Sequence, residues 1–213
     1  MERIGIYGGT FNPPHIGHLE AAKQAVSRLN LDRLLMVPAS IAPHKVLPPN
    51  SPTAQQRLAM LRIAAADCPQ IQVSDVELCR EGVSYTWQTV RTLRQQNPQA
   101  ELILIMGTDM FLSFHQWKNP ERILKYAQLG VFYRGTPGER ADIHRRKAEM
   151  EQQGYKVHLL QNEVVDISST QLRRLLAFRC AGAFLPEGVL DYIREHRLYD
   201  TCTDWRNLPM EEL

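Results

Sequence analysis

The segment Leu102–Met106 consists of five consecutive apolar residues with no polar residue between them. Such a run favours a strand that is buried on both faces, as in the middle of a parallel sheet. Similar runs occur at Ile4–Tyr7, residues 33–37 and Leu129–Tyr133, and segments with helical periodicity separate them. This alternation predicts an α/β protein with a Rossmann-like open parallel sheet and helices on both faces.

Weaker sequence patterns predict the remaining helices and strands. Apolar residues spaced three and four apart predict a helix that contains Leu19 and Leu29. Thr53 is a candidate N-cap for a helix of about 14 residues. A short strand is expected at 71–73, with residues 76–80 as its continuation, and a last strand at 156–160. Further helices are expected after Ser84–Thr86, at 110–114, from Pro120, at 139–153, after Ile167–Thr170 and at 189–196.

The composition is that of an ordinary globular protein. The chain has 213 residues, 44% hydrophobic and 23% charged, and a net charge of +2. We expect one domain over residues 1–200 and a polar tail at 201–213. The near-neutral charge argues against a nucleic-acid partner, and no apolar run approaches the roughly 20 residues of a membrane span. Four scattered cysteines and the lack of a signal-like segment predict reduced thiols and a cytoplasmic location.

The stretch Gly8–His18 predicts a phosphate site. Its glycines allow a ligand to approach the backbone, and a helix start offers free N–H groups and the positive end of a dipole. His15 and His18 are three residues apart, so they share a face of the first helical turn and can donate to phosphate oxygens. The stretch matches neither G-x-x-x-x-G-K-[ST] nor G-x-G-x-x-G, which disfavours a P-loop kinase and a nicotinamide dehydrogenase. A zinc site is also disfavoured, because no third ligand has suitable spacing.

A second polar stretch, Ile167–Arg173, combines three hydroxyl residues with an arginine one helical turn later. Such hydroxyls are often only N-caps, but with the arginine they also suit a polyphosphate. Ligands of open parallel sheets bind beyond the carboxyl ends of the strands. We therefore expect the polar clusters that follow the predicted strands to form one site, namely Gly8–His18, Ala42–Lys45, Gly107–Asp109, Arg134 and Ile167–Arg173.

These motifs carry a family resemblance. His15-Ile16-Gly17-His18 resembles the H-x-G-H signature of the nucleotidyltransferase superfamily, and Ile167–Arg173 resembles its I-S-S-T-x-x-R partner. The glycine turn, together with Pro43–Lys45, Ser84–Thr86, Gly107–Asp109 and Trp117, is similar to bacterial nicotinate-nucleotide adenylyltransferases.

The resemblance implies that ATP and nicotinate mononucleotide give deamido-NAD and pyrophosphate, with Mg²⁺ accompanying the ATP. It implies catalytic roles for His15, His18 and Arg173, with His18 contacting the transition state. The residues that it assigns to ATP are Gly8, Gly9, Thr10, Phe11, Gly17, Gly107, Asp109, Ile167, Ser168, Ser169 and Thr170. Those that it assigns to the mononucleotide are Asn12, His44, Lys45, Tyr85, Thr86, Trp117 and Arg134. We infer no metal ligand from the chain, because no carboxylate cluster accompanies the signature.

Several alternatives remain at this point. The acceptor could be phosphopantetheine or nicotinamide mononucleotide, as in other adenylyl- or cytidylyltransferases of the superfamily. A non-catalytic nucleotide-binding regulator is disfavoured, because both histidines and Arg173 are present. Homo-oligomers are compatible with the sequence, and the proline-rich loop at 39–52 is long enough to close as a lid.

Overall fold

A computed structural model describes residues 1–43, 46–133, 137–161, 167–178 and 180–199. The predicted tail at 201–213 lies outside these residues. The strands are β1 (Arg3–Gly9), β2 (Arg33–Pro38), β3 (Ile71–Val73), β4 (Glu101–Gly107), β5 (Ala127–Tyr133) and β6 (Val157–Gln161). The helices are α1 (Ile16–Arg28), α2 (Ala54–Ala64), α3 (Thr86–Gln96), α4 (Thr108–Leu112), α5 (Pro120–Leu124), α6 (Pro137–Gln152), α7 (Ser169–Ala177) and α8 (Val189–Glu195), with 3₁₀ turns η1 (Phe114–Gln116) and η2 (Gly182–Phe184).

The six strands form a parallel sheet in the order β3-β2-β1-β4-β5-β6. The chain runs outward from β1 to β3 and then crosses back to pair β4 with the other side of β1. The strand order therefore reverses between β1 and β4, and a ligand crevice is expected beyond the carboxyl ends of these two strands. The observed sheet confirms the α/β fold class predicted from the apolar runs.

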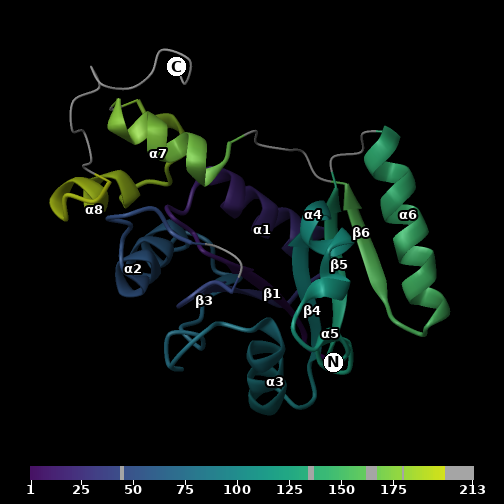
Figure 1. Cartoon of the computed structure of the whole chain (residues 1–213). Coiled ribbons are helices and arrows are strands. Elements are labelled where there is room, and N and C mark those ends of the chain that lie inside the picture. Colours follow the sequence, from purple (N-terminus) through teal and green to yellow (C-terminus); the bar gives the residue numbers. More distant parts are fainter. Residues whose placement is uncertain (44–45, 134–136, 162–166, 179, 200–213) are drawn as a thin grey trace.

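Helices cover both faces of the sheet. Leu34 and Met36 face one apolar core, whereas Leu35 and Val37 face the other, because successive strand residues point to opposite sides. Helices α1, α2, α7 and α8 supply the first core, and α3, α4, α5 and α6 supply the second. In Figure 1, α8 lies beside α2 at one end of the sheet with α7 above it, and α6 lies beside β6 at the other end.

Two helices begin at side-chain caps, of which Thr53 was predicted from the sequence. The Thr53 hydroxyl accepts the Gln56 N–H at 3.2 Å at the start of α2, and Ser168 accepts the Gln171 N–H at 3.2 Å at the start of α7. Helix α2 is shorter than expected, with 11 residues instead of about 14. It stops because the chain turns after Ala65, whose carbonyl accepts the Cys68 N–H.

The predicted continuation of β3 over residues 76–80 is wrong. The carbonyl of Asp75 accepts the N–H groups of Leu78 and Cys79 at 2.8 and 3.1 Å, so this segment is a turn. Its Glu77 is buried and accepts a hydrogen bond from Thr89 of α3 at 2.6 Å, which holds the chain away from the sheet. The helix expected at 110–114 is displaced, because α4 starts directly after β4 and η1 follows it.

Among the described residues, no helix combines the length and the apolar character that a membrane crossing needs. Cys68, Cys79 and Cys180 are free thiols in the structure, as expected from their scattered positions. Cys202 lies outside the described ranges.

Candidate active site

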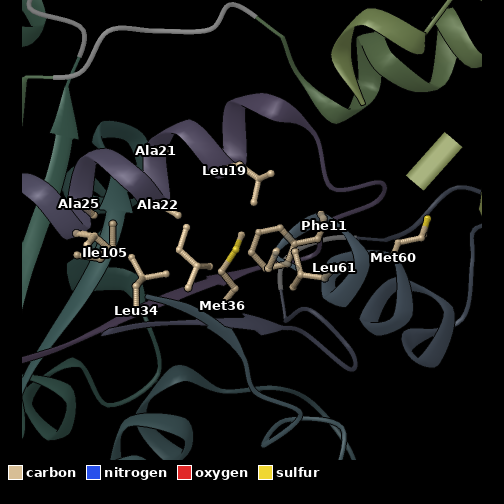
Figure 2. Close-up of a cluster of buried hydrophobic side chains, with 14 of the residues drawn as sticks. Phe11, Leu19, Ala21, Ala22, Ala25, Leu34, Met36, Met60, Leu61 and Ile105 are labelled. Carbon is tan, nitrogen blue, oxygen red and sulfur yellow. The ribbon is translucent and has the colours of Figure 1, made fainter. Parts of the chain in front are cut away.

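The turn after β1 is supported from inside the core. Phe11 has a φ of 46°, in the left-handed region, and its side chain is only 1% exposed. Figure 2 shows its ring among Leu19 of α1, Met36 of β2 and Leu61 of α2. A Cβ atom on Gly9 would lie 3.0 Å from the tip of this ring, so glycine is needed where the turn passes over Phe11. Phe11 therefore shapes the turn from beneath.

His15 and His18 are in contact at the start of α1. Their ring centroids are 3.6 Å apart. His15 is the N-cap rather than a residue of the first helical turn, with an extended φ of −144°. The backbone N–H of His15 donates to Nδ1 of His18 at 3.2 Å. Because Nδ1 of His18 accepts, the neutral ring of His18 carries its proton on Nε2.

His15 is held uncharged by burial. Its residue is 5% exposed, and its Nδ1 has no hydrogen-bond partner within the described ranges. Burial lowers the pKa of His15 to about 4, so the imidazole is neutral at pH 7. A Cβ atom on Gly17 would lie 3.0 Å from Nδ1 of His15, which explains the glycine of the H-x-G-H motif. A neutral imidazole offers one donor and one acceptor nitrogen.

Helix α7 is hydrogen-bonded to the turn between β1 and α1. Arg173 donates from Nη1 to the carbonyl of Asn12 at 2.8 Å and from Nη2 to the Thr170 hydroxyl at 3.2 Å. The Ser169 hydroxyl donates to the carbonyl of Pro13 at 3.2 Å. Ile167 also lies against Gly17, where an added Cβ would be 3.4 Å from its Cγ2. The two motifs, about 150 residues apart in sequence, therefore form one surface, as the sequence predicted.

Open space lies over the ends of β1 and β4. A Cβ atom on Gly8 or on Gly107 would meet no heavy atom within 4 Å among the described residues. These strands are neighbours in the sheet at the point where the strand order reverses. Asp109 is exposed in the first turn of α4, directly after β4. The neighbouring Thr108 hydroxyl contacts both the Phe132 carbonyl and Glu139. The space suits a flat group that approaches the strand ends.

Tyr85 and Thr86, which the resemblance assigns to the mononucleotide, follow Ser84, and Ser84 is bonded to the loop after β2. The Ser84 N–H donates to the carbonyl of Ile41 at 2.8 Å, and the Ser84 hydroxyl accepts the Ser40 N–H at 3.0 Å. Tyr85 is the N-cap of α3, and its side chain makes no cap hydrogen bond. Thr86 is the first residue of that helix. The Tyr85 side chain therefore does not cap the first-turn N–H groups of α3, although the Tyr85 carbonyl accepts the Gln88 N–H at 3.0 Å.

Trp117 is half-buried at the end of η1 and packs against Phe114, with ring centroids 5.3 Å apart. Its assignment to the mononucleotide stays a prediction. His44, Lys45 and Arg134, which the resemblance assigns to the mononucleotide, lie outside the described residues.

A cavity of about 400 Å³ opens between the loops after β1 and β2. The residues that line it are Thr10, Ala39, Ser40, Ile41, Ala42, Pro43, Val46, Leu47 and Arg57. Hollows of about 490 and 550 Å³ lie at the amino edge of the sheet instead, around residues 96–100 and 67–71. Because ligands of parallel sheets bind at the carboxyl edge, the cavity beside Thr10 belongs to the candidate site.

Three residues of this region were missed by the sequence analysis. Arg57 reaches from α2 to carbonyls of both loops. Ser51 accepts from the Asn12 side chain at 3.1 Å, and the Tyr199 hydroxyl donates to Oδ1 of Asn12 at 2.7 Å. Asn12 is only 1% exposed, so its amide is committed to these contacts in this structure. Arg57 precedes Leu58 and Leu61 on the apolar side of the helix, and that position was a usable signal of burial.

No group of three histidine, cysteine, aspartate or glutamate side chains in the described ranges could hold a metal ion.

This sheet order, the glycine turn at its switch point and the histidine pair at a helix start define an α/β nucleotide-binding protein. The chain belongs to the cytidylyltransferase-like family, whose model matches residues 6–175.

Relatives in this family resemble the chain over almost its full length. A protein of Neisseria meningitidis serogroup C named "Probable nicotinate-nucleotide adenylyltransferase" is 36% identical over 206 residues, covering 94% of this chain and 100% of that protein. A Synechococcus protein of the same name is 38% identical over 200 residues, covering 93% and 95%. The Plasmodium falciparum nicotinic acid mononucleotide adenylyltransferase complexed with NaAD shares the fold, with a TM-score of 0.71 and 20% identity over 94% of this chain and 98% of that one.

Proposed function

We propose that this protein transfers the adenylyl group of ATP to nicotinate mononucleotide, giving deamido-NAD and pyrophosphate in NAD biosynthesis. The observation that carries this proposal is the junction of the two motifs, in which Ser169 and Arg173 hydrogen-bond to the carbonyls of Pro13 and Asn12. The relatives named as nicotinate-nucleotide adenylyltransferases support the choice of acceptor, because they match 93–94% of the chain at 36–38% identity.

The transfer needs no general base. An oxygen of the mononucleotide phosphate is already anionic, so it can attack the α-phosphorus of ATP in line. The bond from that phosphorus to the oxygen bridging to the β-phosphate then breaks, and the electron pair leaves with pyrophosphate. The protein has to align the two anions and stabilise the charge that develops on the phosphate oxygens.

The geometry suggests how the motif residues share this work. The Nε2–H of His18 is a hydrogen-bond donor. The tautomer of the His18 ring is fixed because the His15 N–H donates to its Nδ1. The neutral His15 imidazole stacks against it and limits its rotation. The Arg173 guanidinium adds a permanent positive charge beside the turn, for the β- and γ-phosphates. Mg²⁺ enters as part of the ATP substrate and is held by phosphate oxygens and water.

The start of α3 provides a place for the acceptor's carboxylate. The N-cap Tyr85 does not use its side chain to satisfy the first-turn N–H groups, and a carboxylate can accept from them at the positive end of the helix dipole. A neutral carboxamide gains less from this arrangement, so we propose a preference for the acid over the amide. The ring of the acceptor then stacks on Trp117.

Turnover measurements test this function. Purified protein with ATP, Mg²⁺ and nicotinate mononucleotide is expected to form deamido-NAD and pyrophosphate in equal amounts, measured by chromatography and a coupled phosphate assay. His18→Ala should lower turnover by at least about 100-fold, the scale on which one transition-state donor is lost. His196→Ala is the matched control, because His196 is exposed at the end of α8 and should leave turnover unchanged.

Parallel reactions with nicotinamide mononucleotide and phosphopantetheine show whether the acceptor is assigned correctly. Turnover with phosphopantetheine and none with nicotinate mononucleotide would reject the proposed acceptor. Near-normal turnover of His18→Ala would remove His18 from the mechanism.

A further inference from the structure

Arg57 is a buried charge that the proposed transfer does not use. Its side chain is 1% exposed, and it is the largest among the described side chains that are less than 2% exposed. Arginine is almost never fully buried unless it is paired. No carboxylate of the described residues lies within 4 Å of its nitrogens, and its Nε has no hydrogen-bond partner among these residues. Burial accordingly lowers its pKa.

The partners of this guanidinium are backbone carbonyls of two different loops. Nη1 donates to the carbonyl of Thr10 at 2.6 Å, in the loop after β1. Nη2 donates to the carbonyls of Ala39 and Ser40 at 2.7 and 3.2 Å, in the loop after β2. One flat group therefore joins the loop that precedes the histidine pair to the loop that lines the 400 Å³ cavity.

The position of these contacts matters, because the sheet ends just before them. Strands β1 and β2 pair as far as Gly9 and Pro38, and the hydrogen bond from the Ala39 N–H to the Gly9 carbonyl is 2.9 Å long. Beyond this hydrogen bond the two strands end, and the segments that follow them form the two loops. Arg57 donates to carbonyls immediately past this point, so it fixes the distance between the first residues of the two loops.

Stability alone is a poor reason for a charge at this place. Burying a charge has a large desolvation cost, and among the described residues backbone carbonyls offset that cost for Arg57. The planar fork of a guanidinium holds acceptors on two sides in a fixed geometry, whereas a lysine ammonium is a compact donor on a flexible stem and an apolar side chain donates no hydrogen bond.

We infer that Arg57 is a positioning residue that fixes the ATP-side loop relative to the acceptor-side loop, and this inference rests on the proposed adenylyl transfer. Arg57 is 1% exposed, so in this proposal it acts through the two loops and not through a contact with either substrate. By fixing the two loops, it aligns the acceptor phosphate with the α-phosphorus of ATP. Its loss therefore affects the transfer step more than the binding of either substrate. A misplacement of about 1 Å can cost about 100-fold in rate.

The test compares Arg57→Met, Arg57→Lys and the matched control Arg62→Met. Arg62 lies on the same helix, but its side chain is 57% exposed and pairs with Asp75 at the surface. We expect Arg57→Met to lower kcat by about 100-fold, while the dissociation constants of ATP and of nicotinate mononucleotide, each measured alone by calorimetry, change less than about threefold. Arg57→Lys keeps the charge but should still lose at least about tenfold in kcat. Arg62→Met should match the wild type.

Each result decides between a positioning role and a purely structural one. A kcat of Arg57→Met or Arg57→Lys within threefold of the wild type overturns the inference, as does a loss of affinity for either substrate as large as the loss of turnover. If Arg57→Met does not fold, Arg57→Lys alone decides, because a role for the charge alone predicts normal turnover in that variant. An inactive wild type rejects the proposed function instead, so the two failures are distinguishable.

Discussion

At the scale of the residue, His15 shows how burial tunes one group of a motif. The unfolded chain protonates this histidine near pH 6.5, whereas the folded protein does so only near pH 4. Between these values the unfolded state binds a proton that the folded state does not. The free energy of unfolding must therefore fall as the pH is lowered through this window, and this contribution is absent above it.

The size of the effect follows from the shift. From pH 7.5 to pH 5, the wild type should lose about 2 kcal/mol more unfolding free energy than His15→Gln, which has no titrating ring. Urea unfolding of both proteins at the two pH values measures this difference, and other titrating groups cancel in the comparison. Equal losses in the two proteins would show that the His15 imidazole is not desolvated as the structure indicates.

At the scale of the element, the chain after α8 supports the turn after β1. The Tyr199 hydroxyl donates to Oδ1 of Asn12, a residue that is 1% exposed. Tyr199→Phe should lower the unfolding free energy by about 1–3 kcal/mol, because it leaves a buried oxygen without its donor. Tyr155→Phe is the control, since Tyr155 is a half-buried tyrosine that packs against the other apolar core. Urea unfolding measures the free energy of unfolding of both variants. An equally small loss in the two would show that Tyr199 does not stabilise the turn after β1.

The elements also show what the sequence could predict. Leu102–Met106 and the other apolar runs were predicted correctly as strands. A strand that is buried on both faces is a continuous apolar run, and such a run is easy to recognise in the sequence. Thr53 was found as a cap because capping depends on neighbours along the chain. The motif residues met at the carboxyl edge because every strand is parallel.

What the sequence did not reveal depends on contacts between distant segments. Residues 76–80 looked like a strand, but Glu77 is bonded to Thr89 across a turn. Arg57 bonds to carbonyls 47, 18 and 17 residues away, and Tyr199 bonds to a residue 187 positions away, and no local pattern encodes such distances. His15 appeared to be a helical residue, but its extended φ makes it the N-cap.

At the scale of the whole molecule, some glycines are packed against neighbouring side chains and others face open space. Gly130 lies in the middle of β5, where an added Cβ would be 2.7 Å from Cδ1 of Ile105 on the neighbouring strand. Gly8 lies at the carboxyl end of β1, where an added Cβ would meet nothing within 4 Å in the described part of the chain. The same substitution should therefore have opposite effects at the two positions.

Gly8→Ala should change the unfolding free energy by less than about 0.5 kcal/mol, because the methyl group enters open space and no positive φ is involved. It should weaken ATP binding by at least about tenfold, because the methyl group occupies the place of the nucleotide. Gly130→Ala should lower the unfolding free energy by about 1–3 kcal/mol through overpacking, with ATP affinity within about threefold of the wild type. Urea unfolding and calorimetric titration with ATP measure both variants. Normal ATP binding by Gly8→Ala would mean that the nucleotide does not cross the end of β1, whatever the acceptor of the reaction is.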